Sequence, residues 1–135
     1  MNYWLMKTEP GTYSWDDLVN DKRTHWDGVR NYQARNNMKE MKVGDLALYY
    51  HSVNEKCVMG IAKIVKEYYQ DPTTDDERWV VVDIEPVEKL KRSITLAEIK
   101  SDERLSQMVL VNNSRLSVQP VRKEEFDLVV GMGQS

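Results

Sequence analysis

The sequence is poor in the residues that bind metals or cross-link a chain. Its 135 residues include a single cysteine, Cys57, and two histidines. One cysteine excludes an internal disulfide framework and a cysteine-based zinc site. The histidines, His25 and His51, are far apart and do not form an H-x-x-H pair. We therefore expect no metal and no cofactor.

Long apolar runs and common enzyme motifs are also missing. No stretch approaches the ~18–20 residues of a membrane span. The N-terminal residues lack the basic and then apolar pattern of a signal peptide. We therefore expect a cytoplasmic protein with no membrane partner. The chain has no G-x-S-x-G, no H-E-x-x-H and no Walker loop, so a non-enzymatic protein is predicted.

The composition fits one globular domain over residues 1–135, with 41% hydrophobic and 30% charged residues. The net charge of −3 argues against a protein that coats nucleic acid nonspecifically. The charge is uneven, because residues 22–42 carry six bases and two acids, whereas residues 67–88 carry eight acids and one base. This pattern indicates either a basic site for an anionic partner or two ordinary solvated faces.

Short apolar runs alternate with short helical patterns, and no βαβ rhythm is present. Strands are predicted at residues 3–8, 45–52, 57–65, 79–87 and 117–121, and helices after Ser14, from 31 to about 41, after the capping box at Thr95, at 102–108 and at 123–130. Gly60 inside a strand predicts a bulge or a close approach of another group. This pattern predicts an α+β, barrel-like domain.

The segment 25–38 is rich in polar and aromatic residues. A helical period places Asn31, Ala34, Met38 and Met41 on one face, with Arg35 beside Asn31. Polar groups on an apolar face conflict with core packing, which predicts a functional site. Trp26, in the loop before this helix, is either a core aromatic or a surface on which a planar base stacks.

Two predicted strands end in polar residues. Lys7-Thr8-Glu9 ends the first, where the side chains contact a ligand or Lys7 simply pairs with Glu9. Strand alternation points Thr8 away from both neighbours, which argues against a nucleophile there. His51 ends the second strand and is either an anion ligand or structural. Arg115, in a polar cluster, binds phosphate or buried carbonyl groups.

Several of these stretches together resemble the EVE domain of the thymocyte nuclear protein family. They are residues 3–10, 26–36, 50–52, 60–62 and 114–121, and they extend in the family's order over nearly the whole chain. Thr8 stands where many relatives have serine, which keeps the hydroxyl. The resemblance implies a PUA-like fold, a mixed β-barrel with peripheral short helices, related to the YTH domains that read methylated adenine in RNA.

The resemblance also implies a module that recognises a modified base, such as a modified cytosine in DNA or a methylated base in RNA. The pocket would be formed by Lys7, Thr8, Glu9, Trp26, Asp27, Gly28, Val29, Asn31, Tyr32, Tyr50, His51 and Ser52. Trp26 would be one aromatic wall, and the candidates for a second are Tyr32, Tyr49 and Tyr50. Arg30, Arg35 and Arg115 would contact phosphate or other anions.

Two further functions stay open from the sequence. PUA-like relatives include an amidohydrolase that acts on acetylated cytidine, so a small hydrolase of modified nucleosides is one. A sensor of a small anionic metabolite is the other. A monomer is expected in either case, and nucleic acid is the expected partner of the binding module.

Overall fold

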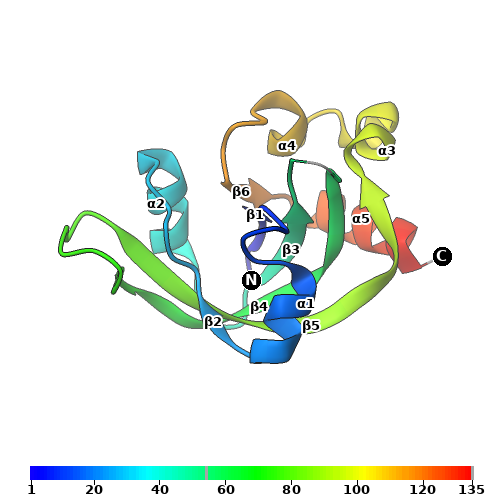
Figure 1. The fold of residues 1–135 in the computed structure, drawn as a ribbon. Coiled ribbons are helices and arrows are strands. Elements are labelled where there is room, and N and C mark those ends of the chain that lie inside the picture. The colour runs from blue at the N-terminus through cyan, green and yellow to red at the C-terminus, as the bar shows by residue number, and fades with distance from the viewer. Residues whose placement is uncertain (54, 135) are drawn as a thin grey trace.

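The computed structural model describes residues 1–53 and 55–134 of the chain. A mixed six-stranded sheet forms its centre, in the order β2-β5-β4-β3-β1-β6. The strands are β1 (Tyr3–Thr8), β2 (Thr24–His25), β3 (Leu46–His51), β4 (Cys57–Gln70), β5 (Val80–Thr95) and β6 (Val118–Val121). β1 runs parallel to β3, and the other neighbouring pairs are antiparallel. The long strands β4 and β5 curve beneath the rest of the fold (Figure 1).

Short helices lie around this sheet, so the predicted α+β fold is confirmed. They are α1 (Trp15–Asp21), α2 (Tyr32–Glu40), α3 (Leu96–Ser101), the 3-10 helix η1 (Glu103–Leu105), α4 (Val109–Asn112) and α5 (Lys123–Gln134). Capping boxes at Ser14 and Thr95 begin α1 and α3, as predicted. Among the described helices, none has the length and apolar character needed to cross a membrane.

Some elements differ from their predicted bounds. β4 and β5 extend well beyond the predicted apolar runs, because the two strands pair with each other over most of their length and through several register shifts. The sequence patterns do not predict β2, which has two residues, or α4, which has four, because both are too short to show a period. α5 continues past residue 130 because a glycine fits where the helix touches β5: a Cβ on Gly133 would lie 2.7 Å from the Leu90 side chain.

The sheet separates two clusters of buried side chains. On β1, Trp4 and Met6 belong to one cluster, while Leu5 belongs to the other. This confirms the predicted alternation of a strand that is buried on both faces. The middle of β1 therefore sits deep in the molecule, while Tyr3 at one end and Lys7 and Thr8 at the other are partly exposed.

Gly60 marks a close approach between β4 and α1. A Cβ at this position would lie 2.7 Å from the Trp15 ring and 2.8 Å from the Glu88 carbonyl oxygen. The ladder between β4 and β5 shifts register at the same place. The bulge and the close contact predicted for this glycine are both present, and together they let Trp15 pack against the sheet.

Candidate functional site

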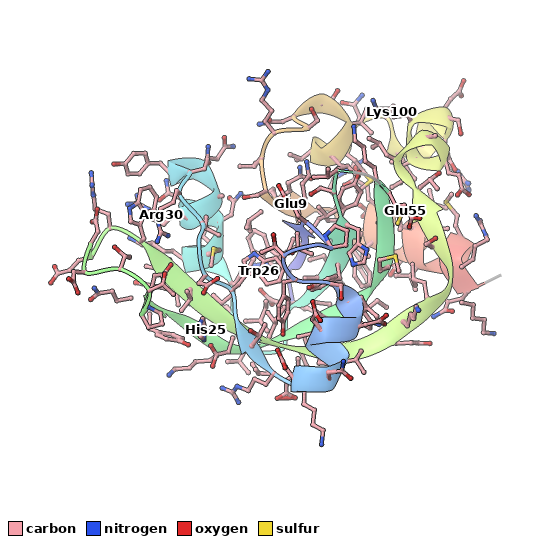
Figure 2. All side chains as sticks on the ribbon, in the orientation of Figure 1. Glu9, His25, Trp26, Arg30, Glu55 and Lys100 are labelled. Atoms are coloured by element: carbon pink, nitrogen blue, oxygen red, sulfur yellow. The ribbon has the colours of Figure 1, made fainter. Side chains whose placement is uncertain are left out.

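A cavity of about 590 Å³ opens where the end of β1 faces the segment between β2 and α2. Ligand pockets typically have volumes of roughly 300–1,000 Å³. Its lining residues are Lys7, Thr8, Glu9, Thr12, Tyr13, Thr24, His25, Trp26, Asp27, Gly28, Val29, Arg30 and Ser117. Figure 2 shows Glu9 and Trp26 near the centre of the molecule, with Arg30 on the side of α2. The cavity thus brings together two of the segments predicted to form a site.

Trp26 is a core residue and a lining residue at once. Trp26 is 8% exposed, and it belongs to the same buried cluster as Trp4 and Met6. The ring packs edge-to-face on Tyr49, with centroids 5.6 Å apart, and its backbone N–H donates to the Val82 carbonyl at 2.8 Å. The two roles weighed for Trp26 are therefore compatible, because the core fixes a ring whose remaining surface faces the cavity.

The β1 wall of the cavity is held by bonds to the backbone. The Thr8 hydroxyl donates to the Tyr13 carbonyl at 2.7 Å, and the backbone N–H and hydroxyl of Ser52 both donate to the Thr8 carbonyl. The Lys7 ammonium donates to the Ser114 carbonyl and lies 5.7 Å from the Tyr50 ring centroid. Burial, reinforced by nearby Lys56, lowers the pKa of Lys7.

Glu9 stands out on this wall because its carboxylate is uncommitted. Lys7 and Glu9 do not pair, and the carboxylate of Glu9 makes no hydrogen bond or ion pair with any residue that the structure describes. Across the cavity, the Asp27 carboxylate lies 3.5 Å from the His25 imidazole, and both side chains are about half exposed. The cavity therefore offers carboxylate oxygens as hydrogen-bond acceptors.

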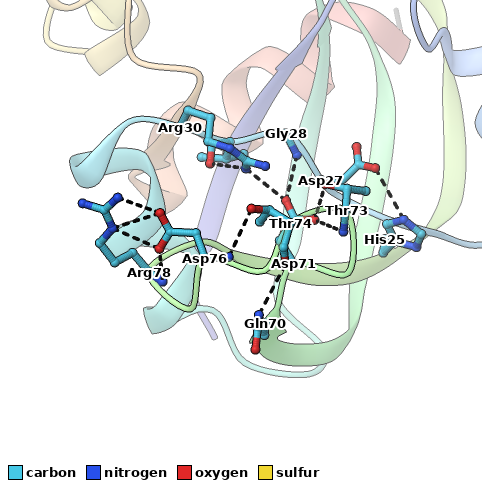
Figure 3. A network of polar contacts seen from close by, with 11 residues as sticks. His25, Asp27, Gly28, Arg30, Gln70, Asp71, Thr73, Thr74, Asp76 and Arg78 are labelled. Atoms are coloured by element: carbon cyan, nitrogen blue, oxygen red, sulfur yellow. Dashed lines mark hydrogen bonds and ion pairs between the residues drawn. The ribbon is translucent and has the colours of Figure 1, made fainter.

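The opposite wall is held by Asp71, which comes from the distant loop between β4 and β5 (Figure 3). Its fully buried carboxylate accepts from the Gly28 N–H and from the Arg30 guanidinium, each at 3.1 Å. Its other oxygen accepts from the N–H and hydroxyl of Thr73. Burial by itself would raise the pKa of Asp71, but the bonds from Thr73, Gly28 and Arg30 outweigh it and lower the pKa to about 2.

Sequence reasoning missed Asp71 entirely. The only local signal is the Asp71-Pro72-Thr73 turn, in which an aspartate accepts bonds from the residue two positions on. That signal predicts a turn, not a partner more than 40 residues away. Gly28 has a positive φ of 76°, which favours glycine, and this conformation directs its N–H toward the carboxylate.

The second polar strand end, at His51 of β3, stabilises the fold and does not line the cavity. His51 is buried, and its Nε2 accepts a hydrogen bond from the Trp15 N–H at 3.0 Å. Burial lowers the pKa of His51 and favours the neutral ring that this bond requires. Tyr50 is buried in the other cluster, where burial raises its pKa to about 12. Tyr50 and His51 pair with Lys7 and Thr8 of β1. In the part of the chain described, neither they nor Ser52 lines the cavity, contrary to the prediction.

The predicted conflict on the face of α2 does not occur. Asn31 precedes the helix as its N-cap, and its side chain accepts from the Ala34 N–H at 2.9 Å. Arg35 bonds to the Asn36 side chain and the Arg78 carbonyl instead of entering the core. Ala34 and Met38 form the buried face. The prediction that Asn31 and Arg35 point into the apolar face is wrong, because capping satisfies the asparagine before the helical period begins.

Two further predicted residues, Tyr32 and Arg115, are exposed. Tyr32 is 51% exposed, and its ring packs against Trp79 with centroids 5.1 Å apart. Arg115 is exposed, two positions from the lining residue Ser117. Neither residue lines the cavity in the described part of the structure.

Comparison with known proteins identifies the family. The model of the EVE domain matches residues 2–132. The chain belongs to the EVE domain family. Human thymocyte nuclear protein 1 is 39% identical to this EVE domain over an alignment that covers 97% of the chain and 73% of the human protein.

Two solved structures extend the comparison. The human protein THYN1, in complex with DNA containing 5-methylcytosine, matches with a TM-score of 0.92 and 39% identity, covering 100% of this chain and 99% of that one. The YTH domain of the Zygosaccharomyces rouxii MRB1 protein, in complex with N6-methyladenosine RNA, matches with a TM-score of 0.64. It is 11% identical and covers 99% of this chain and 87% of its own, so this likeness concerns the fold alone. Both neighbours bind nucleic acid that carries a methylated base.

Proposed function

We propose that this EVE domain binds a modified base of a nucleic acid and does not catalyse a reaction on it. The base enters the cavity between the end of β1 and residues 24–30. The observation that carries this proposal is the cavity itself. Trp26 forms part of its floor, and the exposed Glu9, whose carboxylate has no partner among the described residues, lies on its lining. The human relative in complex with 5-methylcytosine DNA supports the choice of ligand.

The polar groups of the cavity favour a base with an exocyclic amino group. Carboxylates accept hydrogen bonds from the amino group of cytosine, and such a contact discriminates between bases by about 1–3 kcal/mol. Glu9 and Asp27 both line the cavity and supply such oxygens. A methylated cytosine keeps its amino group, so it satisfies this requirement. Extruding a base from a duplex costs a few kcal/mol, which these contacts and the face of Trp26 would offset.

The hydrogen bonds of Lys7 and Thr8 support a binding function over hydrolysis. The ammonium of Lys7 donates to the Ser114 carbonyl, whereas the Thr8 hydroxyl donates to the Tyr13 carbonyl. A nucleophile and its base need to lie within hydrogen-bond reach of each other. These two groups instead serve different backbone carbonyls.

Glu9→Ala tests the proposal, because Glu9 is exposed and its removal leaves the core intact. We expect its affinity for a 5-methylcytosine oligonucleotide to fall by about 5- to 100-fold, as loss of one base contact predicts. Glu103→Ala, an exposed carboxylate on η1 away from the cavity lining, is the matched control and should bind like the parent. Fluorescence anisotropy with modified and unmodified oligonucleotides measures both.

Trp26→Phe is the better variant for testing the aromatic residue on the floor of the cavity. Trp26→Ala would remove a buried ring and destabilise the fold by roughly 3–5 kcal/mol, which would obscure any effect on binding. Equal binding by the parent, Glu9→Ala and Trp26→Phe would contradict the assignment of the cavity. Release of a product from a modified nucleoside would contradict the non-enzymatic part.

A further inference from the structure

A stack of planar side chains begins at Arg30, which also lines the cavity. We call it the aromatic–arginine stack, and it consists of Arg30, Tyr32, Arg35, Arg78 and Trp79. The guanidinium of Arg30 lies 5.6 Å from the Trp79 ring centroid, and Trp79 packs on Tyr32. Arg35 lies 5.0 Å from the Tyr32 ring centroid. The pair of aromatic rings, Trp79 and Tyr32, thus has an arginine on either side of it, Arg30 next to Trp79 and Arg35 next to Tyr32.

The stack joins two parts of the chain that are far apart in sequence. Tyr32 and Arg35 come from α2, whereas Arg78 and Trp79 come from the loop before β5. The Arg78 guanidinium donates to the Tyr32 hydroxyl at 3.0 Å, and Arg35 donates to the Arg78 carbonyl. Arg30 belongs both to the stack and to the cavity lining. The stack is therefore continuous with the proposed base site.

The charges in the stack are unequally compensated. Asp71 pairs with Arg30, and Asp76 pairs with Arg78 at 2.6 Å. Arg35 pairs with no carboxylate within residues 1–53 and 55–134. The loop also carries exposed acids at 75 and 77, which limit attraction for a polyanion. The stack therefore presents fixed planes and one uncompensated cation, so stacking contributes more than net charge.

We propose that the aromatic–arginine stack binds the nucleotide that adjoins the modified base. The neighbouring base stacks at the Tyr32–Arg35 end of the stack, where Tyr32 is 51% exposed and supports the Arg35 guanidinium. The Arg35 guanidinium also contacts the phosphate of that nucleotide. This inference rests on the proposed function, because Arg30 links the stack to the cavity. Aromatic and guanidinium planes bind unpaired bases with little sequence preference. The cavity would then choose the base, while the stack would hold the strand.

Two probes separate the stack from the cavity. The nucleoside 5-methyldeoxycytidine fills the cavity alone, whereas a short single-stranded DNA with one central 5-methylcytosine also offers adjoining nucleotides. We expect Tyr32→Ala to weaken binding of the oligonucleotide by roughly 5- to 100-fold and to leave binding of the nucleoside unchanged. Tyr32→Phe keeps the ring and should bind both like the parent.

Arg35→Gln tests the phosphate contact. Loss of one such contact should reduce the slope of log affinity against log salt by about 0.7 for a single strand. Arg104→Gln removes an exposed arginine on η1 and is the matched control. Calorimetric titration with both probes at several salt concentrations measures each constant.

The outcomes distinguish this inference from the proposed function. Parental affinity of Tyr32→Ala for the oligonucleotide would overturn the role of the stack and leave the cavity in place. Equal weakening for nucleoside and oligonucleotide would also overturn it, because the stack would then only support the cavity. If the parent binds neither probe, the proposed function fails and the inference fails with it.

Discussion

The two walls of the cavity are built in opposite ways. The β1 wall is part of the sheet, with β3 paired on one side and β6 on the other, and Ser52 fastens its last carbonyl. The opposite wall, residues 26–30, lies between β2 and α2. Its backbone is tied by one bond from Trp26 to Val82 and by the buried carboxylate of Asp71.

This difference shows where the shape of the cavity is vulnerable. The β1 wall distributes its stability over many bonds, so single changes there should have modest effects. The opposite wall concentrates its support in one residue of a distant loop. A substitution in that loop should therefore change the site more than a substitution on the strand that lines it.

Asp71→Ala should have the largest effect. It leaves the Gly28 N–H and the Arg30 guanidinium without their buried acceptor, at a cost of roughly 2–3 kcal/mol of unfolding free energy. The wall should loosen, and affinity for a 5-methylcytosine oligonucleotide should fall by about tenfold or more. Urea unfolding and anisotropy titrations measure the two effects.

Asp75→Ala, an exposed acid in the same loop, serves as the control and should change neither quantity appreciably. If Asp71→Ala binds as well as Asp75→Ala, the opposite wall does not depend on this carboxylate.

His51 should make the folding stability depend on pH. Burial lowers its pKa and Lys89 acts in the same direction, against Asp16 and Glu55. The folded-state pKa thus lies below the unfolded value of about 6.5, so the unfolded chain takes up the proton first. Stability should be full above pH 6.5 and decrease as the pH falls toward the folded-state pKa.

His51→Ala should cost about 1–2 kcal/mol at neutral pH, since the Trp15 N–H loses its acceptor, and should flatten this pH dependence. His25→Gln, which alters the exposed histidine, should preserve it. Thermal unfolding from pH 5 to 8 makes the comparison. An unchanged profile in His51→Ala would exclude His51 as its source.

Thr8→Val should have the smallest effect. It preserves shape but removes the hydroxyl that donates to the Tyr13 carbonyl, a loss of about 1 kcal/mol. Thr12→Val, on the exposed loop nearby, should be nearly neutral. Chemical denaturation of both variants gives the difference. Similar stabilities would show that the hydroxyl bond does not fasten the loop.

Much of the fold could be predicted from local patterns. The caps at Ser14 and Thr95 and the alternation of β1 rest on backbone geometry or on contacts within a few residues. Gly60 indicated that some group comes close, but not that this group is Trp15, which is distant in the sequence. The family resemblance indicated that the end of β1 and residues 26–28 face one cavity. The prediction that Asn31 points into the apolar face was wrong, because a helical period alone does not distinguish an N-cap from the first buried turn.

The sequence by itself determined the α+β class, because periodicity and capping are local properties, and the order of its motifs indicated the family. That the end of β1 and residues 26–28 face each other was implied by the family resemblance. The tertiary structure alone decided how those segments are held. Asp71 supports Gly28 and Arg30, and Trp79 stacks on Tyr32, because the β4–β5 hairpin folds back beside α2. No local pattern encodes a contact between residues some forty positions apart, since such a contact exists only once the sheet has brought both segments together.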